Sequence, residues 1–379
     1  MKDECDMEKL QKQNVLFFTR TMGLGGTENV VLQLCEIFKP LVNSIVVCSC
    51  GGVNVGKLNE MGIKHYLIPD IDNKSISTII NTCKKIKVIV KKENITIIHT
   101  HHRMAAFYVS VLGLYRKCVF IATAHNTFHD KKFLTHFAYK KCNVIACGEM
   151  VKKNLVEYYE LSENQVTVIH NAVKPFVGEI IEDPQVKKLH EEGCFVIGNI
   201  GRLSEQKGME YYIKAIPEVI KECPQARFVI AGSGEDESKL KELSEYIGAD
   251  KYLTFLGYRN DVQNLMSQLD LVVLSSLWEG FPLTPIEAFS VGKTVIGTAV
   301  DGTTEIIKDG INGLLVEPKK PDELADKICL LVENKGFRKK LENNALSDYN
   351  ESFSFEKLSE QYITFYKSII KQGGSHGKI

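Results

Sequence analysis

Apolar runs of four to six residues alternate with longer amphipathic stretches along the first half of the chain. The runs have the length of buried strands, and the stretches between them repeat apolar residues at helical spacing. We expect strands at residues 14–19, 44–48, 64–68, 95–99, 119–123, 143–146 and 166–169, and helices at 76–92, 104–114, 131–140 and 149–159. This alternation predicts a parallel sheet covered by helices.

A polar stretch that contains Pro175 and runs to Gly193 ends this first set and is expected to be a linker. The alternation then resumes, with no sequence repeat between the halves. The expected strands are 195–200, 227–231, 253–256, 271–274, 294–297 and 314–316, and the expected helices are 206–221, 237–247, 261–269, 322–333 and 337–346. A last amphipathic helix carries Leu358 to Ile369, and residues 373–379 form a polar tail that we expect to be disordered. The pattern predicts an α/β chain with two Rossmann-like domains.

Composition narrows the class of protein. The chain has 379 residues, which is enough for two domains, and 44% of them are hydrophobic. Its 47 basic side chains balance 47 acidic ones, so charge does not favour nucleic acid as a partner. Eleven cysteines without paired CxxC spacing favour reduced thiols over disulfides or zinc. The charged N-terminus and the lack of a long apolar segment predict a cytoplasmic protein.

The most informative stretch follows the strand expected at 271–274. Glu279 lies in a loop with glycine and proline, and Glu287 lies eight positions later in a segment that predicts a helix beginning near Pro285. A strand, a tight loop and a helix N-terminus in this order form an anion site, because free backbone N–H groups face the ligand. Carboxylates beside a bound diphosphate can accept hydrogen bonds from hydroxyl groups.

Cations and glycines stand at other strand ends. Gly201 and Arg202 follow one strand and Lys207 opens the next helix, so the two cations are expected where they can hold a nucleoside diphosphate. A solvated pair at a helix start is the alternative. Gly25 and Gly26 lead from the first strand into a helix and permit a ligand to approach the backbone, with a purely structural turn as the alternative.

The order and spacing of these motifs resemble those of retaining glycosyltransferases of family GT4. The resemblance covers roughly residues 14 to 370 and rests on the Glu279 to Glu287 element, the stretch 201–208 and the stretch Gly25 to Glu28. It implies a GT-B fold, in which two Rossmann-like domains face each other across a deep cleft. It also implies that the last helix returns to the first domain. The domains would be 14–176 plus 356–372, on the acceptor side, and 177–355, which binds the nucleotide sugar.

The resemblance assigns roles to individual residues. Arg202 and Lys207 are expected to stabilise the leaving diphosphate, Glu279 to hold sugar hydroxyls, and His125 to orient the sugar or the acceptor, which makes these four the expected catalytic residues. Glu287 is expected to accept hydrogen bonds from the ribose. The other expected donor-binding residues are Gly25, Gly26, Gly201, Gly232, Tyr258, Arg259, Gly280, Phe281, Leu283 and Thr284, and the expected acceptor-side residues are Thr27, Glu28, His99 and His101.

Histidines gather at two strand ends, where ligands bind in open α/β sheets. His99, His101 and His102 follow one strand, and His125 follows the next. A metal site is one alternative, because His99 and His101 share a face of a strand, but a third ligand at suitable spacing is missing. Structural histidines with satisfied hydrogen bonds are the second alternative.

Two further motifs depart from simple expectations. Asp70-Ile71-Asp72 is a DxD sequence, which other glycosyltransferases use to hold a metal and a diphosphate, but its neighbours are typical of a turn and a helix cap, so we expect a loop. The resembled family is metal-independent, and no cofactor is expected. Asp301-Gly302-Thr303-Thr304-Glu305 resembles the family's Gly-Gly-x-x-Glu element with Asp301 in place of the first glycine. That change puts close backbone approach in doubt there, and a helix cap by Asp301 or Thr303 explains the residues equally well.

The predicted activity is transfer of a sugar from a nucleotide-diphosphate sugar, UDP favoured over GDP, to a hydroxyl of a saccharide or lipid-linked acceptor, with retention of anomeric configuration. Synthesis of cell-surface polysaccharide, lipopolysaccharide or glycolipid is the expected setting, and peripheral attachment to the inner membrane surface stays open. The alternatives are a GT-B-type nucleotide-sugar epimerase, a sugar phosphorylase, and a non-catalytic nucleotide-sugar sensor or assembly subunit. The sugar, the acceptor and the oligomeric state do not follow from the sequence.

Overall fold

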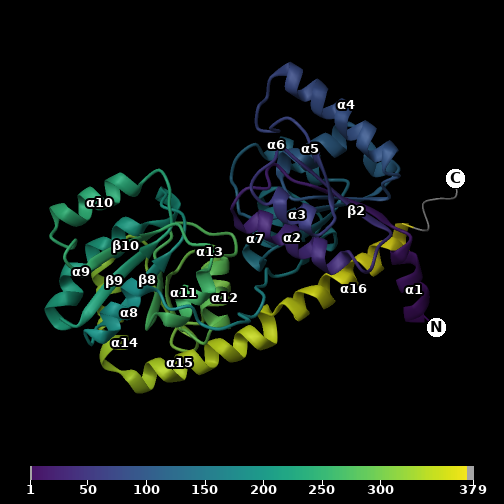
Figure 1. Cartoon of the computed structure of the whole chain (residues 1–379). Coiled ribbons are helices and arrows are strands. Elements are labelled where there is room, and N and C mark those ends of the chain that lie inside the picture. Colours follow the sequence, from purple (N-terminus) through teal and green to yellow (C-terminus); the bar gives the residue numbers. More distant parts are fainter. Residues whose placement is uncertain (1, 374–379) are drawn as a thin grey trace. The chain divides into compact units, whose positions relative to one another are not determined.

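The computed structural model describes residues 2–373 and, within them, the side chains of residues 6–371. The chain forms two compact units (Figure 1). The first unit consists of two segments, one that ends at Asn171 and one that begins at Leu358, and the second unit is Ala172–Lys357. The sequence predicted these breaks after residues 176 and 355. The tail predicted at 373–379 lies outside the described residues, apart from Gly373.

The first unit is built on a parallel seven-stranded sheet with the order β3-β2-β1-β4-β5-β6-β7. Adjacent strands run in the same direction in every pair. The strands are β1 (Asn14–Phe18), β2 (Ser44–Ser49), β3 (Lys64–Leu67), β4 (Ile97–Thr100), β5 (Val119–Ala124), β6 (Asn143–Ala146) and β7 (Val166–Val168). The central strands β1 and β4 are almost fully buried, as expected for apolar strands covered on both faces.

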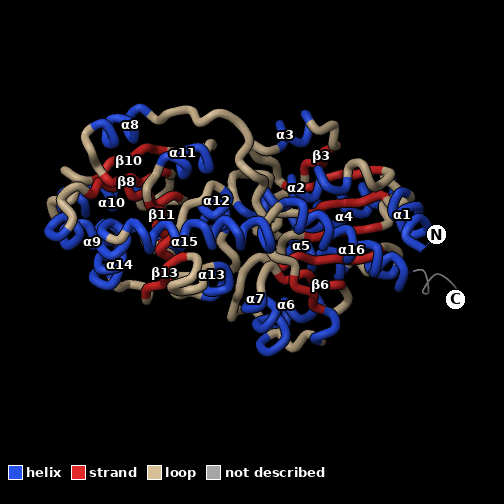
Figure 2. The backbone as a smooth tube through the Cα atoms, turned by 90° about the horizontal axis from the view of Figure 1, so that it is seen from below, coloured by secondary structure: helices blue, strands red, loops and turns tan. Residues whose placement is uncertain are grey.

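Helices cover both faces of this sheet (Figure 2). Crossovers between parallel strands are right-handed, so α2 and α3 lie on one face and α4, α5 and α6 on the other. Tyr108 of α5 lies beside Thr82 of α4, and Phe38 of α2 packs against Tyr366 of α16 with 4.1 Å between ring centroids. The helices are α1 (Lys2–Gln11), α2 (Gly26–Phe38), α3 (Val55–Glu60), α4 (Ile76–Lys92), α5 (Arg103–Val111), η1 (Leu114–Arg116), α6 (Lys132–Tyr139), α7 (Glu149–Lys153), η2 (Asn154–Tyr158), η3 (Glu163–Gln165) and α16 (Phe355–Gly373).

The second unit has a parallel six-stranded sheet with the order β10-β9-β8-β11-β12-β13. Its strands are β8 (Phe195–Ile200), β9 (Ala226–Ala231), β10 (Leu253–Gly257), β11 (Leu271–Leu274), β12 (Val295–Thr298) and β13 (Gly313–Val316). Its helices are α8 (Pro184–Glu191), η4 (Glu205–Lys207), α9 (Met209–Glu222), α10 (Glu237–Tyr246), α11 (Val262–Gln268), α12 (Leu283–Ser290), α13 (Asp301–Ile306), α14 (Pro321–Glu333), α15 (Lys335–Asp348) and η5 (Tyr349–Phe353). The predicted class, α/β with two Rossmann-like units, is confirmed.

The expected linker is wrong for part of its length. Helix α8 occupies Pro184–Glu191, because the Asp183 carboxylate accepts hydrogen bonds from the amides of Gln185 and Val186 and Pro184 fits the first helical position. The Asp-Pro pair was visible in the sequence. Polar residues around it concealed the helix, because only Val186 of the helix is buried.

Strand order reverses direction between β1 and β4 in the first sheet and between β8 and β11 in the second. Loops that leave two such strands at their carboxyl ends diverge and leave room for a ligand. Each sheet therefore has one preferred ligand edge. Many of the residues predicted to carry chemistry follow β1 in the first unit, and β8 and β11 in the second. His125 instead follows β5, and Tyr258 and Arg259 follow β10.

Candidate active site

The second unit brings Lys207 and Glu279 together at the point where its strand order reverses. Lys207, at the end of η4 after β8, donates from Nζ to Oε1 of Glu279, in the loop after β11, over 2.6 Å. Both side chains are largely buried. An ammonium group has three donors, so two remain for other acceptors. The pair that the sequence assigned to the diphosphate and the sugar is thus one contiguous polar group.

Neighbouring hydroxyl groups fix the position of Glu279. Ser276 donates from Oγ to the same Oε1 over 2.7 Å, and Thr298 at the end of β12 donates to the Ser276 carbonyl over 2.5 Å. Oε2 of Glu279 has no hydrogen-bond partner among the described residues. One carboxylate oxygen is therefore held by the protein and the other is left for a ligand.

The loop that carries Lys207 is tied to the loop that carries Glu279. Asn199 of β8 donates to Ser275 Oγ over 2.9 Å, and Ser275 donates in turn to the Lys207 carbonyl over 3.0 Å. The Leu277 amide donates to the Gln206 carbonyl over 2.7 Å. Sequence reasoning did not single out Asn199, Ser275 or Ser276, whose role is visible only once β8 and β11 are known to be neighbours.

Glu287 lies on α12, close enough to Lys207 for the positive charge of the lysine to affect its pKa. Burial raises the pKa of Glu287 to about 7, and the positive charge of Lys207 acts in the opposite direction. Part of the side chain still reaches solvent. A carboxylate held in this way gains from hydrogen-bond donors, because donors stabilise the charged form that burial disfavours.

Helix α12 begins at Leu283, and Pro282 precedes it in an extended conformation. The first amides of a helix have no acceptor within the helix, so those of Leu283 and Thr284 are available to an anion. Phe281 is buried and packs against Phe353 with 6.1 Å between ring centroids. These residues directly follow Glu279 and Gly280 in the chain.

Glycines let the strand-end loops of this unit touch one another. A Cβ atom on Gly232 would lie 1.8 Å from the Gly201 carbonyl oxygen, and one on Gly302 would lie 2.0 Å from the Gly280 carbonyl oxygen. Close backbone approach at the 301–305 motif therefore does occur, at Gly302, despite Asp301. Val300, at the N-cap position of α13, provides no capping hydrogen bond, and Asp301 is the first residue of that helix.

The other predicted donor residues are placed differently. Arg202 is exposed and forms no ion pair or side-chain hydrogen bond within the described part of the chain. Tyr258 is half exposed at the end of β10. Arg259 is not free for a ligand, because its guanidinium binds both Asp183 and Asp261, and these hydrogen bonds raise its pKa further. Its side chain fixes the 258–261 loop against the start of α8, so only the backbone there is left for the predicted base contact.

In the first unit, Gly25 precedes α2 in an extended conformation, and Gly26 and Thr27 form the first turn of that helix. Glu28 turns back over the turn, because a Cβ atom on Gly25 would lie 2.5 Å from Oε2 of Glu28, and Thr21 donates to the other carboxylate oxygen. A carboxylate in the first turn already stabilises the helix N-terminus. It also repels a second anion, so this loop suits hydroxyl groups better than the phosphates predicted for Gly25 and Gly26.

The clustered histidines have different surroundings. His99 is buried and has both ring nitrogens engaged, Nδ1 with the Tyr366 hydroxyl at 2.8 Å and Nε2 with Thr123 Oγ1 at 2.7 Å. The structural alternative therefore holds for His99, and the acceptor-side prediction is wrong for it. His101 is also buried, and its Nδ1 lies 3.2 Å from Nε2 of His125, while its Nε2 has no hydrogen-bond partner among the described residues.

His125 keeps part of its surface exposed, as does His102, whereas His99 and His101 are buried. Burial, assisted by the charge of His102, lowers the pKa of His125 to about 4. Burial also holds the pKa of His101 well below its usual range. Both rings are therefore neutral at pH 7, and His125 can donate or accept one hydrogen bond without carrying charge.

The DxD sequence holds an arginine. Asp70 accepts two hydrogen bonds from Arg20, over 2.9 and 3.0 Å, and Asp72 pairs with the same guanidinium over 2.6 Å. The pKa of Asp70 is lowered chiefly by its hydrogen bond to Arg20. Among residues 6–371, no group of three His, Cys, Asp or Glu side chains is arranged to hold a metal ion.

The chain has two Rossmann-like units, each built on a parallel sheet, and the second has an ammonium group and two carboxylates at its ligand edge. This combination defines the GT-B fold class of glycosyltransferases. Residues 24–175 match the family described as Glycosyltransferase Family 4, and residues 181–348 match the family described as Glycosyl transferases group 1. The chain therefore belongs to glycosyltransferase family 4 and is a glycosyltransferase.

Individual relatives agree with this membership. An uncharacterized glycosyltransferase of Methanocaldococcus jannaschii is 28% identical over 346 residues, 85% of this chain and 86% of that protein. The UDP-Gal:α-D-GlcNAc-diphosphoundecaprenol α-1,3-galactosyltransferase of Escherichia coli is 26% identical over 370 residues, 90% of this chain and 94% of that protein. The crystal structure of Anabaena Alr3699/HepE in complex with UDP-glucose has the same fold, with a TM-score of 0.80, 21% identity, and coverage of 94% of this chain and 99% of that one.

Proposed function

We propose that this glycosyltransferase moves a sugar from a UDP-sugar to a hydroxyl group and retains the anomeric configuration. The observation that carries the proposal is the Lys207–Glu279 pair, with Glu287 beside it, at the strand-order reversal of the second sheet. Preference for UDP is supported by two relatives, one named for a UDP-Gal donor and one crystallised with UDP-glucose. Retention is an expectation for the family.

The donor's diphosphate would lie against Lys207 and the first amides of α12. Two unused ammonium donors and the helix N-terminus would stabilise the charge that develops on the leaving phosphate. Exposed Arg202 would close on the same phosphates. The free Oε2 of Glu279 would accept a hydrogen bond from a sugar hydroxyl, and Glu287 would accept from the ribose hydroxyls.

The first unit would bind the acceptor. Neutral His125 would orient the sugar or the acceptor hydroxyl, and Thr27 and Glu28 would contact the acceptor at the start of α2. We propose that no metal takes part, since both carboxylates of the DxD sequence bind Arg20 and the ammonium group of Lys207 supplies the charge that a cation would otherwise provide. A saccharide or a lipid-linked saccharide is the proposed acceptor, as in the name of the Escherichia coli relative.

Binding and transfer test the proposal together. Calorimetry in EDTA should show binding of UDP and weaker binding of GDP, and a panel of UDP-sugars with hydroxyl acceptors should yield a glycoside whose anomeric configuration NMR reports. Lys207→Met should lower kcat about a hundredfold or more, the usual effect of removing one preorganised charge-stabilising donor. Lys239→Met is the matched control, because Lys239 of α10 is exposed and forms no ion pair with the described residues.

Each alternative function predicts a different experimental outcome. Exclusive binding of GDP would refute the donor assignment, and an inverted product would refute retention. Sugar interconversion without an acceptor would identify an epimerase, and cleavage that requires free phosphate would identify a phosphorylase. Tight nucleotide binding that survives Glu279→Gln, with no product from any acceptor, would favour a sensor.

A further inference from the structure

Three helical segments on one face of the first sheet contain no acidic residue. Residues 74–92, 103–118 and 131–142 carry thirteen lysines and arginines and no aspartate or glutamate, although the chain as a whole has equal numbers of both charges. The segments include α4, α5 with η1, and α6, which lie on the same face. We call the solvent side of these three segments the basic surface.

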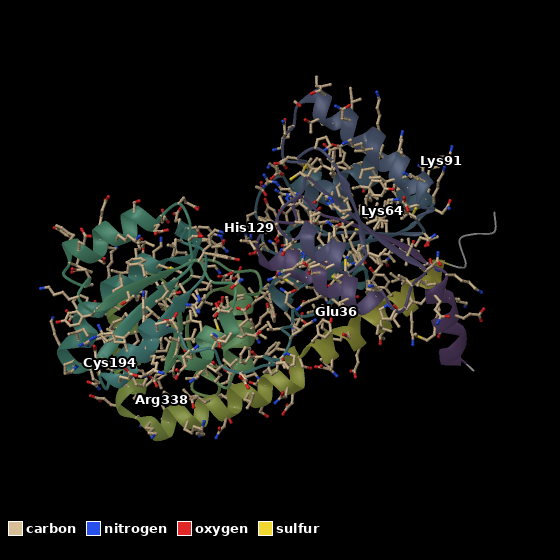
Figure 3. The ribbon with its side chains drawn as sticks, viewed as in Figure 1. Glu36, Lys64, Lys91, His129, Cys194 and Arg338 are labelled. Carbon is tan, nitrogen blue, oxygen red and sulfur yellow. The ribbon has the colours of Figure 1, made fainter. Side chains whose placement is uncertain are left out.

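Most of these cations are not neutralised by the protein. Arg103 and Lys131 pair with Asp130, and Lys132 pairs with Glu160. The other ten form no ion pair within the described residues: Lys74, Lys84, Lys85, Lys87, Lys91, Lys92, Arg116, Lys117, Lys140 and Lys141. Lys91, for example, projects from the C-terminal end of α4 away from the sheet (Figure 3).

The basic surface also exposes large apolar side chains. Phe133 is 91% exposed on α6, and Phe137, one turn further on, is exposed as well and lies 5.9 Å from the Phe107 ring of α5 between centroids. On α4, Ile76 is 77% exposed and Val88 is 61% exposed. Apolar groups of this size among unpaired lysines indicate a surface that meets both an apolar phase and negative charge.

We propose that the basic surface docks this enzyme on an anionic phospholipid bilayer. The two phenylalanines of α6 would enter the headgroup layer, and the lysines of α4 would meet lipid phosphates while their stems cover apolar surface. A nucleic acid would satisfy the lysines but has no place for Ile76 and Val88. Docking goes beyond the proposed function, because it requires neither donor nor acceptor. Within residues 2–373, no helix has the length and apolar character to cross a bilayer.

Flotation of the full-length protein with vesicles tests the proposal. We expect the protein to float with phosphatidylcholine vesicles that contain 30% phosphatidylglycerol, to stay behind with pure phosphatidylcholine, and to be released by salt as screening increases. Lys84→Gln, Lys87→Gln and Lys91→Gln combined should lower the partition coefficient about a hundredfold, since each lysine near a charged bilayer contributes about fivefold. Phe133→Ser with Phe137→Ser should lower it at both low and high salt.

Matched controls lie on α10 of the second unit, where Tyr246 is 89% exposed and Lys239 forms no ion pair with any described residue. Tyr246→Ser and Lys239→Gln should leave flotation unchanged, and all variants should keep the wild-type melting temperature and UDP affinity. Binding to both vesicle types alike, no binding, or wild-type flotation of the α4 and α6 variants would overturn the proposal. Retention on single-stranded RNA without flotation would assign the surface to nucleic acid instead. A protein that floats but lacks transferase activity would refute only the proposed function.

Discussion

Replacing Glu287 with glutamine should stabilise the second unit at alkaline pH. The pKa of this carboxyl rises from 4.5 to about 7 on folding because the side chain is buried. A shift of this size corresponds to about 3 kcal/mol, and partial exposure of the side chain reduces the expected gain to about 1–3 kcal/mol. The folded protein binds this proton more tightly than the unfolded chain does. The free energy of unfolding of the wild type therefore falls as pH rises from 4.5 through 7. Glutamine does not titrate, so the variant does not lose this contribution.

Urea unfolding of wild type and Glu287→Gln at pH 5 and pH 8.5 measures this difference. The single tryptophan, Trp278, lies in the loop after β11, so its fluorescence reports the unfolding of the second unit. The stability difference should grow in favour of the variant between pH 5 and pH 8.5. Glu242→Gln, at an exposed glutamate of α10 with no ion pair in the described residues, should show no such growth.

A stability difference that does not change with pH, or that grows in favour of wild type, would refute the reasoning about Glu287. The same variant also separates stability from function. If the ionised carboxylate accepts ribose hydroxyls, Glu287→Gln should bind UDP more weakly than wild type at pH 8.5 although it is more stable. Equal UDP affinity in the two proteins would remove Glu287 from the proposed donor site and leave the stability argument intact.

Three further predictions concern packing and ionisation. Gly302→Ala should lower thermal stability by more than about 2 kcal/mol, because its Cβ would overlap the Gly280 carbonyl, whereas Gly336→Ala within α15 should raise stability by about 0.5–1 kcal/mol. Arg259→Met should destabilise the second unit by about 3 kcal/mol in urea unfolding, since Asp183, which is buried, loses its cation, and equal midpoints for the two proteins would contradict this. Acid should unfold the first unit over pH 6.5 to 4 in circular dichroism, because its buried histidines have lowered pKa values and stability is lost as pH falls below the unfolded value of 6.5.

Periodicity predicted the architecture because parallel strands buried on both faces leave an unambiguous apolar signal. Thirteen strands were expected and the same thirteen are present in the described residues, with most bounds within two residues. Short elements with one or two buried residues escaped, as α3 with its single buried Leu58 and α8 with Val186 illustrate. Such elements are held by caps and neighbours, which periodicity does not detect.

The candidate site was only partly predictable, because a motif gives residue types without their partners. The sequence named Lys207, Glu279 and Glu287, and strand order then made the first two an ion pair. It also named His99 and Arg259, whose polar atoms turn out to be engaged with Tyr366, Thr123 and two aspartates. Those partners lie up to 267 residues away in the chain, so a local sequence pattern does not predict these hydrogen bonds.

Helix α16 has a consequence for how the protein is made. Tyr366 completes the hydrogen bonds of His99 and the packing of Phe38, so the first unit lacks part of its interior until residue 366 has been translated. Residues 172–357 are continuous and can acquire their structure on the ribosome without that delay. The half synthesised first is thus the half finished last, and nascent chains stopped before residue 358 should display a folded second unit beside an incomplete first one.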